Sequence, residues 1–127
     1  MKIFGIGTDI VKISRIQKSA NNKLFLSRIF NQAEIKKCKK TKSNFNCLAK
    51  RFAAKEAFSK ALGTGISKGI SFNEIIILNE KNGKPFIKLI NTTKKIVEKK
   101  IKKKIFKISL SLTDEDKYAV AFVTISI

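Results

Sequence analysis

Apolar and polar positions in the first third of the chain predict a strand followed by short helices. Residues 3–11 are mostly apolar and β-branched, with Gly5 and Gly7 among them. This pattern predicts a first strand that another stretch of backbone can approach closely. Short helices are expected over residues 12–20, 24–29 and 32–40.

The main helix is predicted over residues 45–62. This segment contains no Gly or Pro, and Gly63 follows it as a C-terminal stop. Three of its alanines are spaced by four residues, namely Ala53, Ala57 and Ala61. Residues four apart share one face of a helix, so these alanines predict a narrow face against which a second backbone can pack.

The second half of the chain predicts strands that return in antiparallel hairpins. Residues 63–69 are expected to form a loop that contains Gly and Ser, and residues 82–85 (Asn-Gly-Lys-Pro) a tight turn. Strands are expected over residues 72–78, 86–90, 105–112 and 118–127, and a basic helix over residues 91–104. We therefore predict one α+β domain over residues 1–127, with a mainly antiparallel sheet packed against a long central helix.

Composition limits the chemistry of the site. The 127 residues include no histidine, which excludes a His-based triad and nearly excludes a zinc site. Cys38 and Cys47 lack a short metal-ligand spacing and are expected to be free thiols in a reducing cytoplasm. The apolar stretch after Met1 is interrupted by Asp9 and Lys12, so neither a signal peptide nor a membrane span is predicted, and we expect a cytoplasmic protein.

The formal net charge of +19 indicates attraction to polyanions, which include nucleic acid, acidic proteins and phosphorylated small molecules. The many Lys, Ile, Asn and Phe residues are also typical of AT-rich coding sequence, so charge alone does not select the partner. A basic nucleic-acid-binding module is one interpretation. However, the chain lacks the aromatic and basic motifs of common RNA-binding folds, and residues 99–104 fit the solvent-facing side of an amphipathic helix.

Acidic residues are scarce, so their positions are informative. Asp9 lies in the first predicted strand, where it either caps the next helix, pairs with Arg15 or serves a functional site. Glu56 lies in the main helix one turn before Lys60. The two form either an ordinary exposed ion pair or a site at which a carboxylate holds a metal beside a phosphate-binding ammonium group.

Two segments carry a resemblance to a known family. Gly-Ile-Gly-Thr-Asp-Ile-Val at residues 5–11, followed by Arg15, resembles the first signature of the holo-acyl-carrier-protein synthases. Residues 51–65 resemble the second signature, and the turn at residues 82–85 and the chain's final segments match in order. These enzymes are 4′-phosphopantetheinyl transferases. Many relatives have histidine near the position of Thr113, which leaves the contacts to adenine open in this chain.

The resemblance implies a reaction, a metal and a set of site residues. The family transfers 4′-phosphopantetheine from coenzyme A to a serine of apo acyl carrier protein, in support of fatty acid biosynthesis, and releases adenosine 3′,5′-bisphosphate. By matching position, Asp9 and Glu56 are expected to hold Mg²⁺, and Lys60 to contact a phosphate oxygen. The base that takes the serine proton is either Glu56 or a metal-bound water, and these alternatives stay open.

The resemblance also implies binding residues and an assembly. Coenzyme A is expected to contact Lys60, Arg51, Gly63 and Gly65, and the acidic carrier protein to contact Arg15, Lys18 and Arg28. Short members of the family form homotrimers with active sites at subunit interfaces, and neither a nucleic-acid nor a membrane partner is expected. An inactive relative that only binds coenzyme A is a second alternative.

Overall fold

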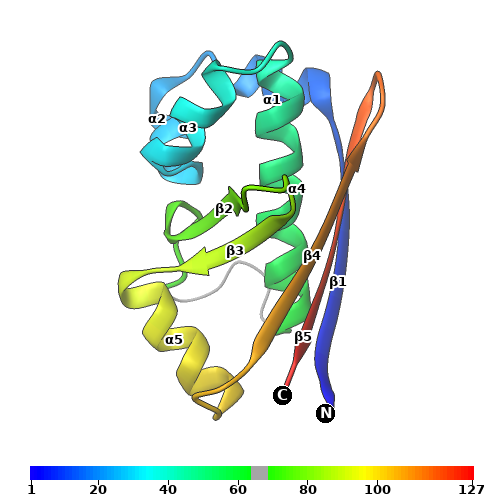
Figure 1. Cartoon of the computed structure of the whole chain (residues 1–127). Coiled ribbons are helices and arrows are strands. Elements are labelled where there is room, and N and C mark those ends of the chain that lie inside the picture. Colours follow the sequence, from blue (N-terminus) through cyan, green and yellow to red (C-terminus); the bar gives the residue numbers. More distant parts are fainter. Residues whose placement is uncertain (64–68) are drawn as a thin grey trace.

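A three-stranded antiparallel sheet lies along one side of the longest helix. The computed structural model describes residues 1–63 and 69–127. The strand order is β1 (Ile3–Lys12), β5 (Tyr118–Ser126), β4 (Lys107–Asp114). Helix α4 (Asn44–Leu62) runs along this sheet (Figure 1). The α+β architecture with antiparallel strands and a long helix is confirmed.

The remaining elements cover the opposite side of α4 (Figure 1). They are α1 (Ile13–Ser19), α2 (Lys23–Ile29), α3 (Gln32–Lys39), the short 3-10 helix η1 (Phe72–Glu74), the hairpin of β2 (Ile75–Asn79) and β3 (Pro85–Leu89), and α5 (Asn91–Ile101). Asn31 caps α3: its side chain accepts from Ala33 N, and its own N–H donates to Glu34 Oε1. Gly63 ends α4 in the left-handed conformation (φ 86°).

The glycines of β1 and the alanines of α4 face each other. An added Cβ on Gly5 would overlap the carbonyl oxygen of Ala61, and one on Gly7 would overlap that of Ala57. The strand backbone therefore lies directly on the helix backbone, and the narrow alanine face predicted from the sequence is the surface on which it packs. This close approach fixes the position of Asp9, two residues further along β1, relative to α4.

We expect Gly7→Ala to destabilise the fold. The new methyl group would meet backbone atoms, which cannot rotate away, so strand and helix must separate. Overpacking of this kind costs about 1–3 kcal/mol in the free energy of unfolding. Urea unfolding followed by circular dichroism measures the change, and an unaltered midpoint would contradict the close packing.

A buried ion pair joins α3, α4 and the start of β2. The Lys55 ammonium is fully buried and donates to Glu34 Oε1 (2.6 Å), Phe72 O (2.7 Å) and Ile75 O (2.5 Å). Burial lowers the pKa of Lys55 to about 8, although the nearby carboxylate of Glu34 opposes the shift. The second oxygen of Glu34 accepts from Ile77 N at 3.0 Å. All three ammonium protons and both carboxylate oxygens are thus used in holding these elements together.

Three sequence-based expectations are wrong. Cys38 and Cys47 are not free thiols but form a disulfide between α3 and α4, because α3 packs against the start of α4 and brings their Cα atoms within 5.4 Å. Residues 72–74 are a 3-10 turn, not the start of a strand. Helix α5 ends at Ile101 and not at residue 104, since Lys102 takes a left-handed conformation (φ 60°). Among the described residues, no helix is both long and apolar enough to cross a membrane.

Candidate active site

The structure brings Asp9 and Lys60 together between β1 and α4. Asp9 faces α4, as Gly5 and Gly7 do, because alternate residues of a strand share one face. The Lys60 ammonium lies 3.3 Å from Asp9 Oδ1 and donates to Thr8 O at 2.9 Å. Asp9 therefore neither caps α1, which has no side-chain cap, nor pairs with Arg15.

Glu56 completes this cluster from the preceding turn of α4. Burial raises the pKa of Glu56, and the negative charge of Asp9 raises it further, while the positive charges of Lys60 and Arg15 oppose the shift. All three charged groups thus lie within electrostatic range of the Glu56 carboxylate. The sequence also allowed an ordinary surface ion pair between Glu56 and Lys60, four residues later. Within the described residues this pair is not formed, because Lys60 contacts Asp9 and Thr8 of β1 instead.

The donor set of this cluster suits magnesium better than zinc. The described residues contain no group of three or more His, Cys, Asp or Glu side chains, which a protein-only metal cage would require. Two carboxylates from different elements are enough for Mg²⁺, which prefers oxygen ligands, keeps several waters and accepts phosphate oxygens. The repulsion between Asp9 and Glu56 is a cost that a bound cation would remove.

A basic pocket opens further along α4, toward its N-terminus. It measures about 510 Å³, and its basic wall consists of Lys37, Lys50, Arg51 and Lys81. We call it the α4 N-terminal pocket. Asn46, Cys47, Asn79 and Asp114 also line it. It begins at Arg51, five residues before Glu56, which is about 7 Å along a helix axis.

Arg51 is largely buried in the wall of this pocket. Its Nη2 donates to Asn79 Oδ1 at 2.8 Å, and its Nη1 lies 3.2 Å from Cys47 Sγ. Its Nε has no hydrogen-bond partner within the described parts of the chain. Burial lowers the pKa of Arg51, although the negative charge of Glu34 opposes the shift. Because its Nε lacks a partner among the described residues, the guanidinium is an incompletely paired cation beside the cavity.

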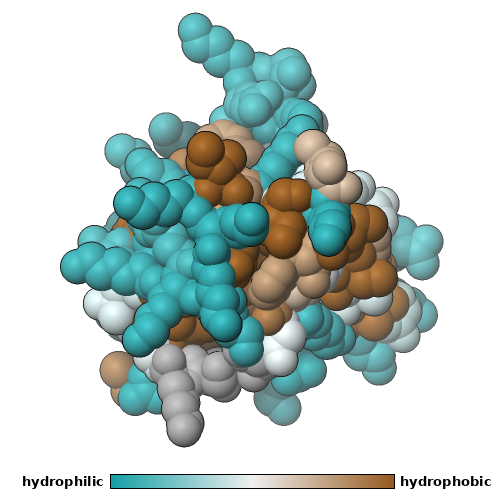
Figure 2. All heavy atoms as spheres, turned by 90° about the horizontal axis from the view of Figure 1, so that it is seen from below, coloured by the Kyte–Doolittle hydropathy of each residue, from teal (hydrophilic) through white to brown (hydrophobic). Residues whose placement is uncertain are grey.

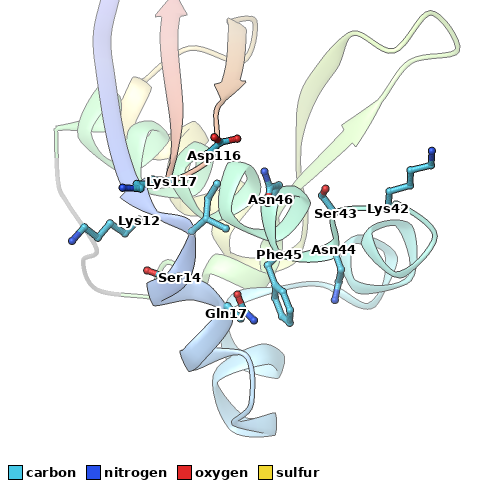
Figure 3. A pocket seen from close by; sticks show the side chains of 11 residues that line it. Lys12, Ser14, Gln17, Lys42, Ser43, Asn44, Phe45, Asn46, Asp116 and Lys117 are labelled. Carbon is cyan, nitrogen blue, oxygen red and sulfur yellow. The ribbon is translucent and has the colours of Figure 1, made fainter.

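A second hollow, of about 650 Å³, lies at the opposite end of β1 from the N-terminus. It is lined by Lys12 and α1, by the start of α4 and by the turn between β4 and β5 (Figure 3). Lys12 and Lys42 extend outward on opposite sides of it (Figure 3). It contains none of Asp9, Glu56 and Lys60, so the larger cavity is not where the paired carboxylates lie.

The other predicted site residues are dispersed. Arg15, Lys18 and Arg28 are all exposed, on α1 and α2, and only Arg15 is close enough to influence Glu56. Gly63 is exposed at the end of α4, and Gly65 lies outside the described residues. Thr113 lies in β4 and borders a small hollow with Ile10 and Tyr118.

Comparison with known proteins identifies the family. The sequence profile of the 4′-phosphopantetheinyl transferase superfamily matches residues 5–123. The chain belongs to this superfamily. A holo-[acyl-carrier-protein] synthase of Pelagibacter ubique is 48% identical over 123 residues, which cover 97% of this chain and 96% of that protein.

Solved structures of the transferase superfamily share the fold. The crystal structure of holo-[acyl-carrier-protein] synthase from Neisseria meningitidis is 39% identical, with a TM-score of 0.88 over 99% of this chain and all of that one. The synthase of Helicobacter pylori, solved in complex with coenzyme A, is 35% identical, with a TM-score of 0.79 over 95% of this chain and 99% of that one.

Sequence reasoning missed three features of this transferase's site. The Thr8 carbonyl holds the ammonium group of Lys60. Two lysines, Lys37 and Lys50, supply charge to the α4 N-terminal pocket, and Cys47, which is bonded to Cys38, lines its wall. Backbone contacts leave no trace in residue identity, and single lysines cannot be told apart in a chain that carries 28 basic residues. The helical spacing of Cys47, Lys50 and Arg51 was the one usable signal.

Proposed function

We propose that the protein transfers 4′-phosphopantetheine from coenzyme A to a serine of apo acyl carrier protein, with release of adenosine 3′,5′-bisphosphate. The observation that carries this proposal is the cluster of Asp9, Glu56 and Lys60, built from both family signatures, in a chain that matches holo-[acyl-carrier-protein] synthases along almost its whole length. A nucleic-acid-binding module would not need two carboxylates that repel each other and phosphate. The intact cluster likewise argues against an inactive relative.

Asp9 and Glu56 would hold Mg²⁺ at this cluster. A bound ion would neutralise the negative charge that develops on the pyrophosphate. Lys60 is placed to contact a phosphate oxygen, since its ammonium already lies beside Asp9 and is exposed to solvent. The proton of the acceptor serine would go either to Glu56, whose pKa is raised by burial, or to a metal-bound water that Glu56 orients.

The α4 N-terminal pocket is the proposed site for the remaining phosphate of coenzyme A. Arg51 contributes an incompletely paired guanidinium, and Lys37 and Lys50 add charge at the same wall. Gly63 and Gly65 are proposed to contact coenzyme A beyond Lys60.

The acidic carrier protein is proposed to dock on α1 and α2. Arg15, Lys18 and Arg28 are exposed there, and Arg15 lies close enough to Glu56 to connect the docking face with the site. Opposite charges raise the rate of encounter and fix orientation. A cytoplasmic location follows from this reaction as part of the same proposal.

We further propose a homotrimer held by the outer face of the three-stranded sheet. This face carries exposed Ile6, Ile10 and Phe122, with exposures of 60%, 62% and 45%. Adjacent apolar side chains of this size mark a protein interface. Seen from the end where both termini lie, hydrophobic side chains are grouped on the surface beside a larger hydrophilic area (Figure 2).

Phe122→Lys is expected to separate the subunits. Each subunit then contributes one lysine to the proposed interface, and the three positive charges repel one another. The side chains of β5 that face the core are unchanged, so the monomer should still fold. Light scattering coupled to size exclusion should show about a third of the wild-type mass. Lys88→Ala, exposed on β3 and outside the three-stranded sheet, is the control and should leave the mass unchanged. A monomeric wild type would contradict the trimer.

Binding of Mg²⁺ is expected to weaken as the pH falls. The weakening should begin at a higher pH than protonation of an ordinary glutamate would cause. Only the ionised carboxylate binds the ion, and Glu56 takes up its proton at a raised pKa. Titration calorimetry with Mg²⁺ at several pH values measures the effect. In Glu56→Gln the residual affinity should lose this pH dependence, and an unchanged profile would contradict the role of Glu56.

The reaction is tested by following adenosine 3′,5′-bisphosphate by chromatography after incubation with coenzyme A, Mg²⁺ and an apo acyl carrier protein. Product should form, and a chelator should abolish it. A carrier with alanine in place of its acceptor serine is the control. Product release with that control carrier would indicate hydrolysis of coenzyme A and would overturn the transfer.

A further inference from the structure

The Cys38–Cys47 disulfide lies in the wall of the α4 N-terminal pocket. Cys47 itself lines the pocket, and so does Lys37, the neighbour of Cys38. The bond closes the segment between α3 and α4, and this segment contributes Thr41 and Ser43 to the same wall, beside Asn46 in the first turn of α4. The disulfide therefore ties together a wall that is otherwise a loop between two helices.

Cys47 has the surroundings of a reactive cysteine. Arg51 Nη1 lies 3.2 Å from its sulfur and also donates to its carbonyl oxygen at 3.4 Å. Cys47 is the fourth residue of the 19-residue helix α4, and its backbone N–H donates to Ser43 O. A guanidinium and a helix N-terminus both stabilise the thiolate, which is the form that attacks a disulfide. Cys47 is slightly exposed, at 7%, whereas Cys38 is fully buried.

We propose that Cys38 and Cys47 form a reversible redox site that controls the affinity of the α4 N-terminal pocket for coenzyme A. This inference rests on the proposed function. In a reducing compartment, disulfides are usually transient and either catalytic or redox-sensing. A pair whose bond closes the wall of a substrate pocket fits the second role.

The oxidant is a low-molecular-weight disulfide such as glutathione disulfide. The Cys47 thiolate attacks one of its sulfurs, forms a mixed disulfide and releases one glutathione thiolate. Cys38 then loses its proton and attacks Cys47 Sγ, which forms the protein disulfide and releases the second glutathione. Two protein thiols are oxidised and one glutathione disulfide is reduced to two thiols, so the electrons balance.

Oxidation is expected to strengthen binding of coenzyme A for two reasons. It fixes the wall formed by Thr41, Ser43 and Asn46, so less conformational freedom is lost when the ligand binds. It also removes the negative charge of the Cys47 thiolate from beside Arg51, which leaves the guanidinium free to attract phosphate. We expect the dissociation constant for coenzyme A to rise about three- to tenfold on reduction.

Titration calorimetry with coenzyme A on the oxidised and the reduced wild-type protein tests the inference. The Cys38→Ser/Cys47→Ser variant cannot close the wall, so it should bind more weakly than the oxidised protein and should not respond to glutathione disulfide. Equal dissociation constants for the two wild-type forms would overturn the redox control but leave the proposed function standing. Failure of both forms to bind coenzyme A would overturn the proposed function and this inference with it.

Single variants test the order of the chemistry by intact mass. With glutathione disulfide, Cys38→Ser should retain one glutathione on Cys47, because the resolving thiol is gone. Cys47→Ser is the matched control and should stay unmodified, because Cys38 is buried. Modification of Cys38 in preference to Cys47 would contradict the assigned roles.

Discussion

Glu56→Gln is expected to lower kcat/KM for the transfer about 10²- to 10⁴-fold, the range typical of a lost general base. Glutamine keeps the size of the side chain but neither ionises nor attracts a cation as a carboxylate does. Because Glu56 is only partly buried and, among residues 1–63 and 69–127, joins none of the structural hydrogen-bond networks, the variant should fold normally. Asp9→Asn should also lose activity, since it removes the other proposed metal ligand.

Steady-state kinetics with coenzyme A and apo acyl carrier protein measures this loss. Glu98→Gln, on α5, is the matched control and should keep wild-type kcat/KM. Activity within a fewfold of wild type in Glu56→Gln would remove Glu56 from the chemistry. Loss in both glutamine variants would indicate an effect of net charge instead of a specific site.

Lys55→Met is expected to be the most destabilising of the substitutions considered. It removes the ammonium that bonds to Glu34, Phe72 O and Ile75 O, and leaves the Glu34 carboxylate buried without a counter-charge. Breaking a buried pair from one side costs about 3–5 kcal/mol in the free energy of unfolding. Denaturant unfolding measures the loss, and Lys36→Met, exposed on α3, should be nearly neutral.

A double-mutant cycle distinguishes the pair from simple loss of packing. Glu34→Gln removes the charge that Lys55→Met leaves uncompensated, so the double variant should be more stable than the sum of the single losses predicts. Strict additivity would mean that the two side chains do not act as a pair.

Much of the fold follows from local sequence signals. The uninterrupted segment before Gly63 predicts α4, and the strands predicted over residues 105–112 and 118–127 correspond to β4 and β5. The alanine spacing even predicts the face on which β1 packs. The errors have physical causes: the conformation of Lys102 that ends α5 and the approach of Cys38 to Cys47 depend on tertiary contacts that no local pattern encodes.

The site was predictable where the sequence carries a scarce residue type. Acidic side chains are few, so Asp9 and Glu56 were recognisable from their positions and the resemblance to a family. The partner of Asp9 was not, because Lys60 reaches it across two elements. Arg51 was expected to be a simple phosphate contact, whereas the structure places it in a network with Asn79 and Cys47.

The most direct test of the proposed function is the intact mass of an apo acyl carrier protein after incubation with this protein, coenzyme A and Mg²⁺. The carrier should gain the mass of one phosphopantetheine group, a chelator should prevent the gain, and Glu56→Gln should slow it strongly. An unchanged carrier mass with folded, coenzyme A-binding protein and several carriers would contradict the account and favour an inactive relative.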